Sequence, residues 1–376
     1  MENARISGWQ LFVLITLFEI GSAFLVGLAM DAKQDAWIAI LVGMISNYAL
    51  IYIYYRLHRY YPHLALTEYI EKIIGKVPGR MLAFLYVLYF ANGAARVLRD
   101  FGAMLLTFVY PDTPLFMVNA LLMLGIIYTL RQGIEVMARS AELLFIFIYV
   151  LAVAGFILIF VSGLIDFTSL RPILEKGIAP VLRVAYSQTI YFPFGEVIVF
   201  AMIFPYTKNV KKTALIVFSA ITLNGINLMI TIIVNIGVLG VTLTSRSAFP
   251  LLGTVQSIQF AGFLERLDVF FMLALITGGF FKIGLFFYAT LLGLSHVFKL
   301  KNPSPLVFPI SLVALFYSLS IAQNYFEHVY EGLKIIPLTL HLPFQIVIPA
   351  LLLVIAFLRN RKKVQSVPVK NTAENS

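Results

Sequence analysis

The chain has 376 residues, of which 60% are hydrophobic and 12% are charged, and this composition excludes an ordinary soluble globular protein. The formal net charge is +10, but the Lys and Arg residues gather in short loops and near the C-terminal end. That is the positive-inside pattern of membrane proteins, so the charge requires no nucleic-acid partner. The chain contains no cysteine, which excludes disulfides, thiolate metal sites and cysteine catalysis.

Apolar stretches long enough to cross a lipid bilayer, about 20 residues each, recur along almost the whole chain. We therefore predict an all-α membrane protein with about ten transmembrane helices. Their expected ranges are 6–30, 37–55, 81–109, 115–130, 142–164, 187–204, 214–240, 265–298, 305–322 and 335–358. Between the second and the third, apolar residues at helical spacing over 66–76 predict a helix on the membrane surface. The apolar but irregular segment 242–262 is expected to be re-entrant or to cap the bundle.

These helices predict one transmembrane domain, 1–358, followed by a basic and disordered cytoplasmic tail at 359–376. An even number of crossings places both termini on one side, and the basic loops indicate that this side is the cytoplasm. The loop 166–183 is an exception, because its three basic residues would face outward. The halves 6–164 and 186–358 then run in opposite directions, and this topology predicts a five-plus-five inverted repeat.

Two of the predicted helices contain residues that interrupt a helix. The sixth has Pro193-Phe194-Gly195-Glu196 at its midpoint. Proline removes a backbone donor, glycine loosens the chain, and a carboxylate is costly in hydrocarbon. Lipid offers no partner for freed backbone groups, so we predict a broken helix whose open backbone lines a polar site. In the first helix, Gly21, Ser22 and Ala23 predict a similar break.

We expect the two breaks to form a ligand site for a small zwitterion such as an amino acid. N–H groups at the first break would hold a carboxylate, and carbonyls at the second would hold an ammonium. The alternatives are small-residue packing between helices at the first break and, at the second, a proline kink closed by its neighbours. The predicted ligand-binding residues are Gly21, Ser22, Ala23, Tyr191, Phe192, Pro193, Phe194 and Gly195.

Charged residues inside the membrane region are a second group of candidates. Glu196 and Lys282 both lie near the middle of the bilayer by residue count, and we predict one electrostatic network that contains them and Arg99. Glu196 would bind the ligand, relay a proton, or pair with a cation that holds the break. Lys282 could instead snorkel along a tilted helix. Arg96 and Asp100 are four residues apart and are expected to neutralise one another. The charge of Arg99 then has no partner nearby in the sequence.

Several short motifs, in order along the chain, resemble those of a known family. They are Ile20-Gly21-Ser22, Thr113-Pro114, Leu170-Arg171-Pro172-Ile173-Leu174 with Gly177 and Pro180, Phe194-Gly195-Glu196, and Glu265-Arg266. The chain resembles the B-subunit family of bacterial spore germinant receptors, the endospore germination permeases of the amino acid–polyamine–organocation superfamily. It departs from this pattern at Leu275, where relatives often have tryptophan.

The resemblance implies a five-plus-five inverted-repeat fold and a nutrient site between helices one, three, six, eight and ten. It also implies residence in the spore inner membrane and a complex with an A subunit and a lipoprotein C subunit. In this superfamily, helices one and eight flank a cation site, so the ammonium of Lys282 would stand in for a bound sodium ion.

The sequence therefore favours a nutrient-sensing subunit of a spore germinant receptor, with an amino acid as the expected ligand. The alternative is an active amino-acid permease of the same fold. An enzyme is not expected, because neither a nucleophile–base set nor a phosphate-binding glycine loop is visible. The histidines lie in loops or near helix ends without metal-ligand spacing, and we expect neither a cofactor nor a metal.

Overall fold

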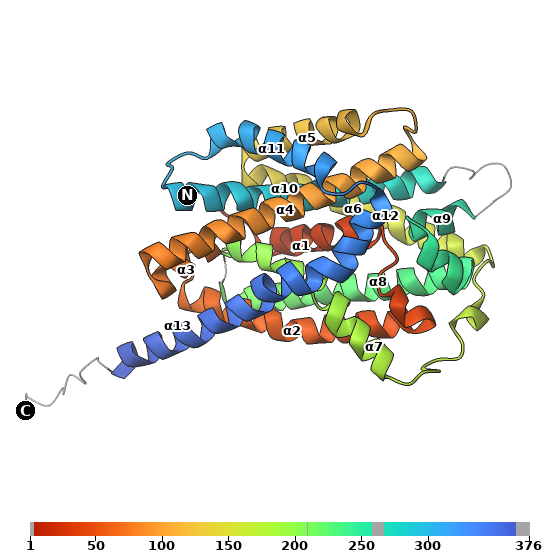
Figure 1. Ribbon diagram of the computed structural model, residues 1–376, viewed down its shortest axis with the longest axis horizontal. Helices are drawn as coiled ribbons and strands as arrows, with labels where there is room; N and C mark the ends of the chain where they lie inside the picture. Colours follow the sequence, from red (N-terminus) through yellow and green to blue (C-terminus); the bar gives the residue numbers. More distant parts are fainter. Residues whose placement is uncertain (1–3, 209, 258–266, 366–376) are drawn as a thin grey trace, which may run out of the picture.

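The computed structural model describes residues 4–208, 210–257 and 267–365, and long helices that run side by side dominate this part of the chain (Figure 1). The first half contains α1 (Gly8–Ala23), η1 (Met30–Asp35), α2 (Ala36–Tyr60), α3 (Leu66–Ile74), α4 (Lys76–Phe108), α5 (Leu115–Gln132) and α6 (Ile134–Val161). The connection and the sixth span contain η2 (Phe167–Leu170), α7 (Ala179–Val184), η3 (Ala185–Thr189), η4 (Phe194–Met202) and η5 (Phe204–Tyr206). The remainder contains α8 (Val210–Arg246), α9 (Pro250–Gln256), α10 (Leu267–Phe298), η6 (Ser304–Leu306), α11 (Val307–Ser320), α12 (Tyr325–Tyr330), η7 (Glu331–Ile335), η8 (Pro337–Val347) and α13 (Ile348–Gln365).

These elements confirm the all-α class and account for ten membrane segments. Seven helices within the described residues are long and apolar enough to cross a membrane. The shorter apolar helix α1, the interrupted segment from α7 to η5, and α11, which is bent by 105° against the following helix, supply the other three. The surface helix predicted over 66–76 is present as α3, and its buried face includes Tyr69, Ile70 and Ile73.

The last span begins ten residues earlier than predicted. Helical dihedrals continue from Tyr325 through the two π-helical segments η7 and η8 into α13. The Asn324 side chain accepts the N–H of Glu327 at 2.9 Å and so caps the start of this helix. The polar residues after it suggest a loop in the sequence, but His328 is buried and Glu331 pairs with Arg96 of α4 at 3.3 Å. Polar residues that face protein are compatible with a membrane helix.

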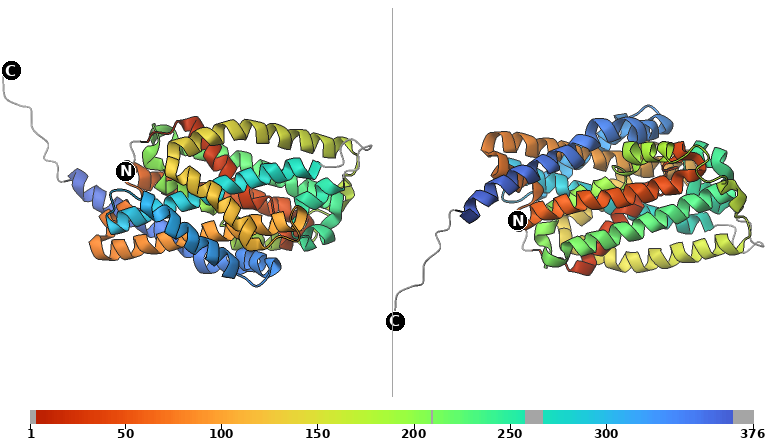
Figure 2. Two further views of the ribbon diagram at one scale, coloured as in Figure 1. Left: turned by 90° about the horizontal axis from the view of Figure 1, so that it is seen from above. Right: turned by 90° about the horizontal axis from the view of Figure 1, so that it is seen from below.

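The C-terminal end of the described chain also differs from the prediction. Helix α13 continues through 359–365, part of the range that we expected to be disordered. Figure 2 shows α13 extending beyond the bundle, and Arg359 Nη1 donates to the carbonyl of Lys72 on α3 at 3.4 Å. Residues 366–376 lie outside the described part of the chain. In the segment expected to cap the bundle, α8 kinks at Gly240 and α9 follows, whereas 258–262 lie outside the described residues.

The two predicted breaks have different geometries. In the sixth span, π-helix η3 is followed by a turn at 190–193 and by the 3-10 helix η4, so the break coincides with Pro193 as predicted. In the first span, α1 remains α-helical to Ala23, and the irregular backbone begins at Phe24. The N–H groups of Gly21, Ser22 and Ala23 therefore lie inside the helix, where they donate within it. The expectation that they are open is wrong.

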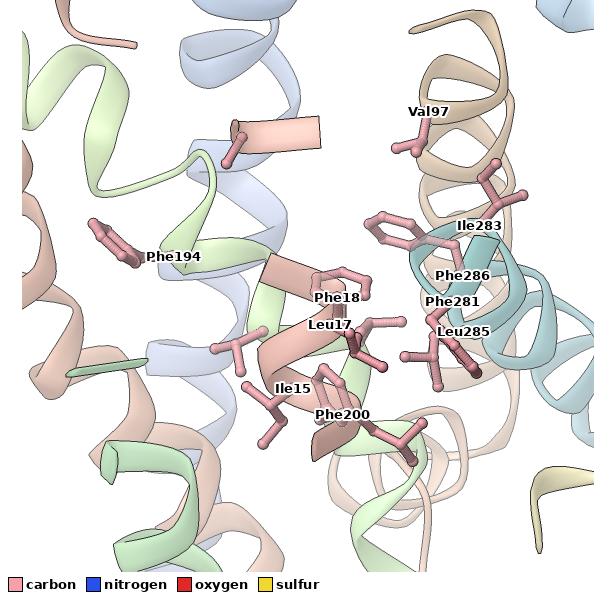
Figure 3. Packing of buried hydrophobic residues seen from close by; sticks show 14 of the residues in the cluster. Ile15, Leu17, Phe18, Val97, Phe194, Phe200, Phe281, Ile283, Leu285 and Phe286 are labelled. Carbon is pink, nitrogen blue, oxygen red and sulfur yellow. The ribbon is translucent and has the colours of Figure 1, made fainter. Parts of the chain in front are cut away.

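Helix α1 occupies the centre of the bundle and is buried over most of its length, as expected for a helix that is apolar all round. Figure 3 shows Leu17 and Phe18 of α1 facing Phe281, Leu285 and Phe286 of α10. The rings of Phe18 and Phe286 have centroids 5.0 Å apart. Helices α5 and α6 lie at the periphery, and unlike α1 they expose large apolar side chains on the surface that lipid would cover.

Two glycines at the breaks are positions of close approach. A Cβ at Gly21 would lie 2.9 Å from Lys282 Cδ and 3.2 Å from the Gly278 carbonyl oxygen, and a Cβ at Gly195 would overlap the Gln345 side chain. We predict that Gly21→Ala and Gly195→Ala each lower the melting temperature of the purified protein, because the neighbours are packed and overpacking costs about 1–3 kcal/mol.

The matched control is Gly253→Ala on α9, where the nearest atom to the new Cβ would be 3.8 Å away. This variant should keep the melting temperature of the parent protein or raise it slightly, since alanine favours a helix over glycine. Equal losses in the three variants would show that the close approaches do not matter.

Candidate ligand site at the broken helices

A small cavity of ≈60 Å³ lies beside both breaks and is bordered by the first, third, sixth, eighth and tenth spans. The side chains that face it are unusually polar for the middle of a membrane protein. Its lining residues include Ser22, Tyr89, Asn92, Arg96, Asp100, Phe192, Glu196, Phe286, His328 and His341. These are the five spans between which the resemblance implied a site.

Glu196 and Lys282 form a direct ion pair in the interior next to this cavity. Lys282 Nζ on α10 lies 2.5 Å from Glu196 Oε2 on η4, and the lysine side chain is fully buried. The ammonium also lies over the rings of Phe18 and Phe192, 4.8 Å and 5.2 Å from their centroids. Lys282 therefore does not snorkel toward water. The 3-10 backbone of the sixth span places Glu196 between the cavity on one side and α10 on the other.

A third ionisable group, Glu19 of α1, belongs to the same interior cluster. Its side chain is 0% exposed, and neither carboxylate oxygen has a hydrogen-bond partner among the described residues. Lys282 and Glu196 are the charged groups that act on it electrostatically. One buried ammonium thus lies near two buried carboxylates. A buried cluster with a net charge is costly, so a proton on one carboxyl group is the simplest way to reach neutrality.

A second set of polar side chains, contributed by α4 and the tenth span, closes the cavity on the side of the tenth span. Arg96 of α4 donates to Glu331 Oε2 at 3.3 Å and also to the carbonyl of His328. His328 Nε2 donates to Asp100 Oδ1 at 3.0 Å. Arg96 and Asp100 therefore pair with the tenth span and not with one another, which corrects the prediction from their spacing. Both also act electrostatically on Glu196.

Aromatic and amide groups form the opposite wall. Gln345 Nε2 donates to the Tyr89 hydroxyl at 2.8 Å, and this hydroxyl lies 2.8 Å from His341 Nδ1. The hydroxyl therefore joins the amide to the imidazole, and the tautomer of His341 sets which of the two groups donates in the second bond. Gln345 also fills the space against Gly195. Both His341 and Gln345 lie in the π-helical segment η8, and π-helical turns occur frequently at functional sites.

The residues predicted from sequence occupy different places around this site. Ser22, Phe192 and Glu196 line the cavity, and the buried Ser22 hydroxyl has no partner among the described residues. Gly21 and Gly195 permit the close approaches of Lys282 and Gln345. The remaining predicted residues pack nearby without lining the cavity, and they are Ala23, Tyr191, Pro193 and Phe194.

Arg99 does not belong to the cluster. Its guanidinium donates to the carbonyl of Ala322 at 3.5 Å, and the cation that acts on Glu196 besides Lys282 is Arg96. Sequence reasoning also missed Asp100, His328 and His341 as members of the site. The spacing Arg96–Asp100 suggests mutual neutralisation, and the sequence pattern puts the two histidines in loops or near helix ends because it predicts a later start for the tenth span. Among the described residues, no group of His, Asp and Glu side chains is placed to hold a metal ion.

The fold is that of a transporter. The structure is similar to the crystal structure of MhsT in complex with L-phenylalanine, with a TM-score of 0.62 and 16% identity over 92% of this chain and 87% of that chain. It is also similar to Mhp1, a nucleobase-cation-symport-1 family transporter, with a TM-score of 0.58 and 14% identity over 86% of this chain and 73% of that chain. These comparisons agree with the predicted inverted repeat. At such identities they show the fold alone.

Sequence comparison then defines the family. Residues 5–326 match the model of the family described as spore germination protein, and the chain belongs to this family. It is 50% identical over 369 residues to spore germination protein KB of Bacillus subtilis (strain 168), a match that covers 97% of this chain and 98% of that protein. The family resemblance inferred from the short motifs is confirmed.

The ion pair predicts a non-additive set of variants. Lys282→Met should be the most damaging single change, because it leaves two carboxylates without their cation, and breaking a buried pair costs about 3–5 kcal/mol. Glu196→Gln should cost less, since Lys282 retains Glu19. The double variant should lose clearly less stability than the two single losses combined. Thermal unfolding of the purified proteins measures each change.

Arg139→Gln serves as the control, because its pair with Glu135 spans 3.9 Å on a largely exposed surface. Exposed pairs contribute about 0–1 kcal/mol, so this variant should unfold near the temperature of the parent protein. Strictly additive losses for Glu196→Gln and Lys282→Met would mean that the two groups do not depend on one another in solution.

Proposed function

We propose that this chain is the membrane-embedded, nutrient-sensing subunit of a spore germinant receptor. The observation that carries the proposal is the polar cavity at the broken sixth span, where Glu196 faces the cavity and simultaneously pairs with Lys282. A ligand that reaches Glu196 competes with the pair that holds the sixth and eighth spans together. Membership of the spore germination protein family supports the biological role.

The proposed ligand is a small nutrient with an ammonium group, namely an amino acid. Its ammonium binds the Glu196 carboxylate, and its carboxylate binds Arg96, the basic side chain that lines the same cavity. The unpartnered Ser22 hydroxyl supplies a further polar contact. Arg96 thus takes the role first expected of backbone N–H groups at the first break. The structure of MhsT with L-phenylalanine shows that a protein with this fold accommodates an amino acid.

The proposed signal is a shift between two packings of the bundle. Gly21 of α1 lies against both Lys282 and the carbonyl of Gly278, so α1 and α10 touch where the lysine passes between them. A change in the partner of Lys282 therefore changes the contact between these two helices. The ligand shifts the equilibrium by its different affinity for the two packings. The A subunit and the lipoprotein C subunit, in the spore inner membrane, are the proposed readers of that shift.

The rival function is active transport of an amino acid. The observation that favours it is an outer cavity of ≈380 Å³, which shares Val26, Val329 and Leu333 with the site and so adjoins it directly. In the orientation with both termini in the cytoplasm, this cavity opens outward. Lys282 occupies the position between the first and eighth spans where the family resemblance implied a cation, so neither function requires a bound sodium ion.

Ligand binding tests the first part of the proposal. The purified chain is titrated calorimetrically with amino acids, sugars and nucleosides, and we expect an amino acid to bind. Glu196→Gln should weaken that binding by about 10–100-fold, because a hydrogen bond to a charged group contributes about 1.5–3 kcal/mol. Asp112→Asn, a change of the same chemistry in an exposed loop, should bind like the parent protein. Binding of sugars or nucleosides alone would overturn the amino-acid assignment.

A spore assay with a matched transport assay separates sensing from transport. Spores that lack the chain should stop responding to one nutrient, and the restored chain should return the response. Glu196→Gln at matched protein levels should raise the nutrient concentration required. Proteoliposomes that contain the purified chain should take up no labelled nutrient. Accumulation of nutrient in the vesicles together with normal germination of the deletion spores would favour the permease.

A further inference from the structure

A large cleft at the opposite end of the bundle from the outer cavity of ≈380 Å³ has a charge that the ligand site does not explain. It has a volume of ≈970 Å³ and lies between α3, the start of α4, the ends of α5 and α10, and the loop 299–304. Six basic side chains line it together with two carboxylates. The basic residues are Lys72, Lys76, Arg80, Arg131, Lys299 and Lys301.

The two carboxylates of the cleft are already engaged. Glu71 pairs with Arg80 at 3.5 Å. Glu68 accepts the N–H of Ala65 at 2.9 Å and lies 3.6 Å from His296 Nε2, and burial raises the pKa of its carboxyl group. Across 4–208, 210–257 and 267–365, none of the other five cations has a carboxylate within ion-pair distance. The cleft therefore carries an excess of positive charge that an anion would neutralise.

The start of α4 adds to this positive field. The helix begins at Lys76, its N-cap is Gly75, and no acidic residue occupies its first turn. Glycine has no side chain to accept the free N–H groups of the first turn. The positive end of the helix dipole therefore borders the cleft, whose lining includes Gly75 and Lys76, and the first turn of α4 supplies no carboxylate to compensate it. At the end of α10, Lys299 adopts a left-handed backbone with φ 55°, a conformation in which glycine is normally preferred.

An apolar, lipid-facing surface borders the cations directly. On α4, Val77 is 72% exposed and Met81 is 67% exposed, one position after Lys76 and Arg80 respectively. Phe84 and Phe298 continue this surface, and their rings meet edge to face with centroids 6.4 Å apart. Helix α4 is a membrane-spanning candidate. The cations thus lie where the hydrocarbon-facing surface of the bundle ends, at the level of lipid headgroups.

We propose that this cleft binds the headgroup of an anionic phospholipid, with its acyl chains along the apolar border formed by Val77, Met81, Phe84 and Phe298. The phosphate lies among the cations that α4 and the loop 299–304 contribute. Basic pockets between membrane helices are suited to anionic headgroups. The positive-inside bias explains why cations occur at this end, but not why they surround one cleft. A free phosphate is much smaller than ≈970 Å³ and would leave the apolar border unused.

The test compares lipids that share acyl chains and differ in headgroup. Purified protein in a neutral detergent is titrated with phosphatidylglycerol, with phosphatidylcholine, or with soluble glycerol 3-phosphate, and thermal unfolding is followed. Phosphatidylglycerol should raise the melting temperature by several degrees more than either of the other additions. In the triple variant Lys76→Gln, Arg80→Gln, Lys299→Gln, it should act only at about 100-fold higher concentration, because each interfacial cation contributes about fivefold.

The matched control removes three exposed cations from loops outside the cleft, with Lys33→Gln, Arg171→Gln and Lys176→Gln. This control should respond to phosphatidylglycerol like the parent protein. Equal stabilisation by phosphatidylcholine, or by glycerol 3-phosphate, would overturn the proposal. So would an unchanged lipid response of the cleft variant. If that variant instead fails to co-purify with its receptor partners while its lipid response persists, the cleft docks an acidic protein surface and the lipid assignment is wrong.

Discussion

The contact between Lys282 and Glu196 is the constraint on which the interior of this protein depends. An ammonium without access to water requires a carboxylate within contact distance, because neither lipid nor apolar side chains compensate its charge. The lysine reaches its partner by passing between α10 and α1, and it does so next to Gly21, where a side chain would collide with it. The position of one charged group thus sets the distance between two long helices. It also requires Glu196 to lie on the face of the sixth span that points to α10.

The irregular backbone of the sixth span satisfies a second requirement. Within a few residues, this span must present Phe192 and Glu196 to the cavity, the same carboxylate to Lys282, and Gly195 to Gln345. The π turn before Pro193 and the 3-10 helix after it distribute these side chains over several directions. Tenth-span residues close the cavity from the other side. The η8 segment is π-helical as well, so both walls that meet at Gly195 and Gln345 depart from α-helical geometry.

The sequence predicts those features of the site that neighbouring residues carry together, and it misses those that depend on contacts between distant helices. The break at Pro193 is visible because proline, glycine and a carboxylate stand together, and Glu196 and Lys282 stand out because a charge in hydrocarbon demands a reason. The first break was placed too early, since Gly21 serves the packing of α1 against α10 and not the opening of a helix. His328 was missed because polar residues at the start of the tenth span resemble a loop. Only the fold shows that they face Arg96 and Asp100.

The same arrangement limits how a ligand can produce a signal. A nutrient that bound every packing of the bundle equally would shift nothing, however tightly it bound. A ligand that takes a share of the Glu196 carboxylate is different, because this carboxylate pairs with Lys282 across the contact between the sixth span and α10, next to Gly21 of α1. Its binding energy then depends on the packing. Glu19 places a second buried carboxylate on α1 near the same ammonium. In the proposed mechanism, this carboxylate compensates the ammonium when a ligand engages Glu196. The proposed sensing mechanism requires a partner for the cation in each of two packings, and a cluster with one cation and two carboxylates supplies both partners.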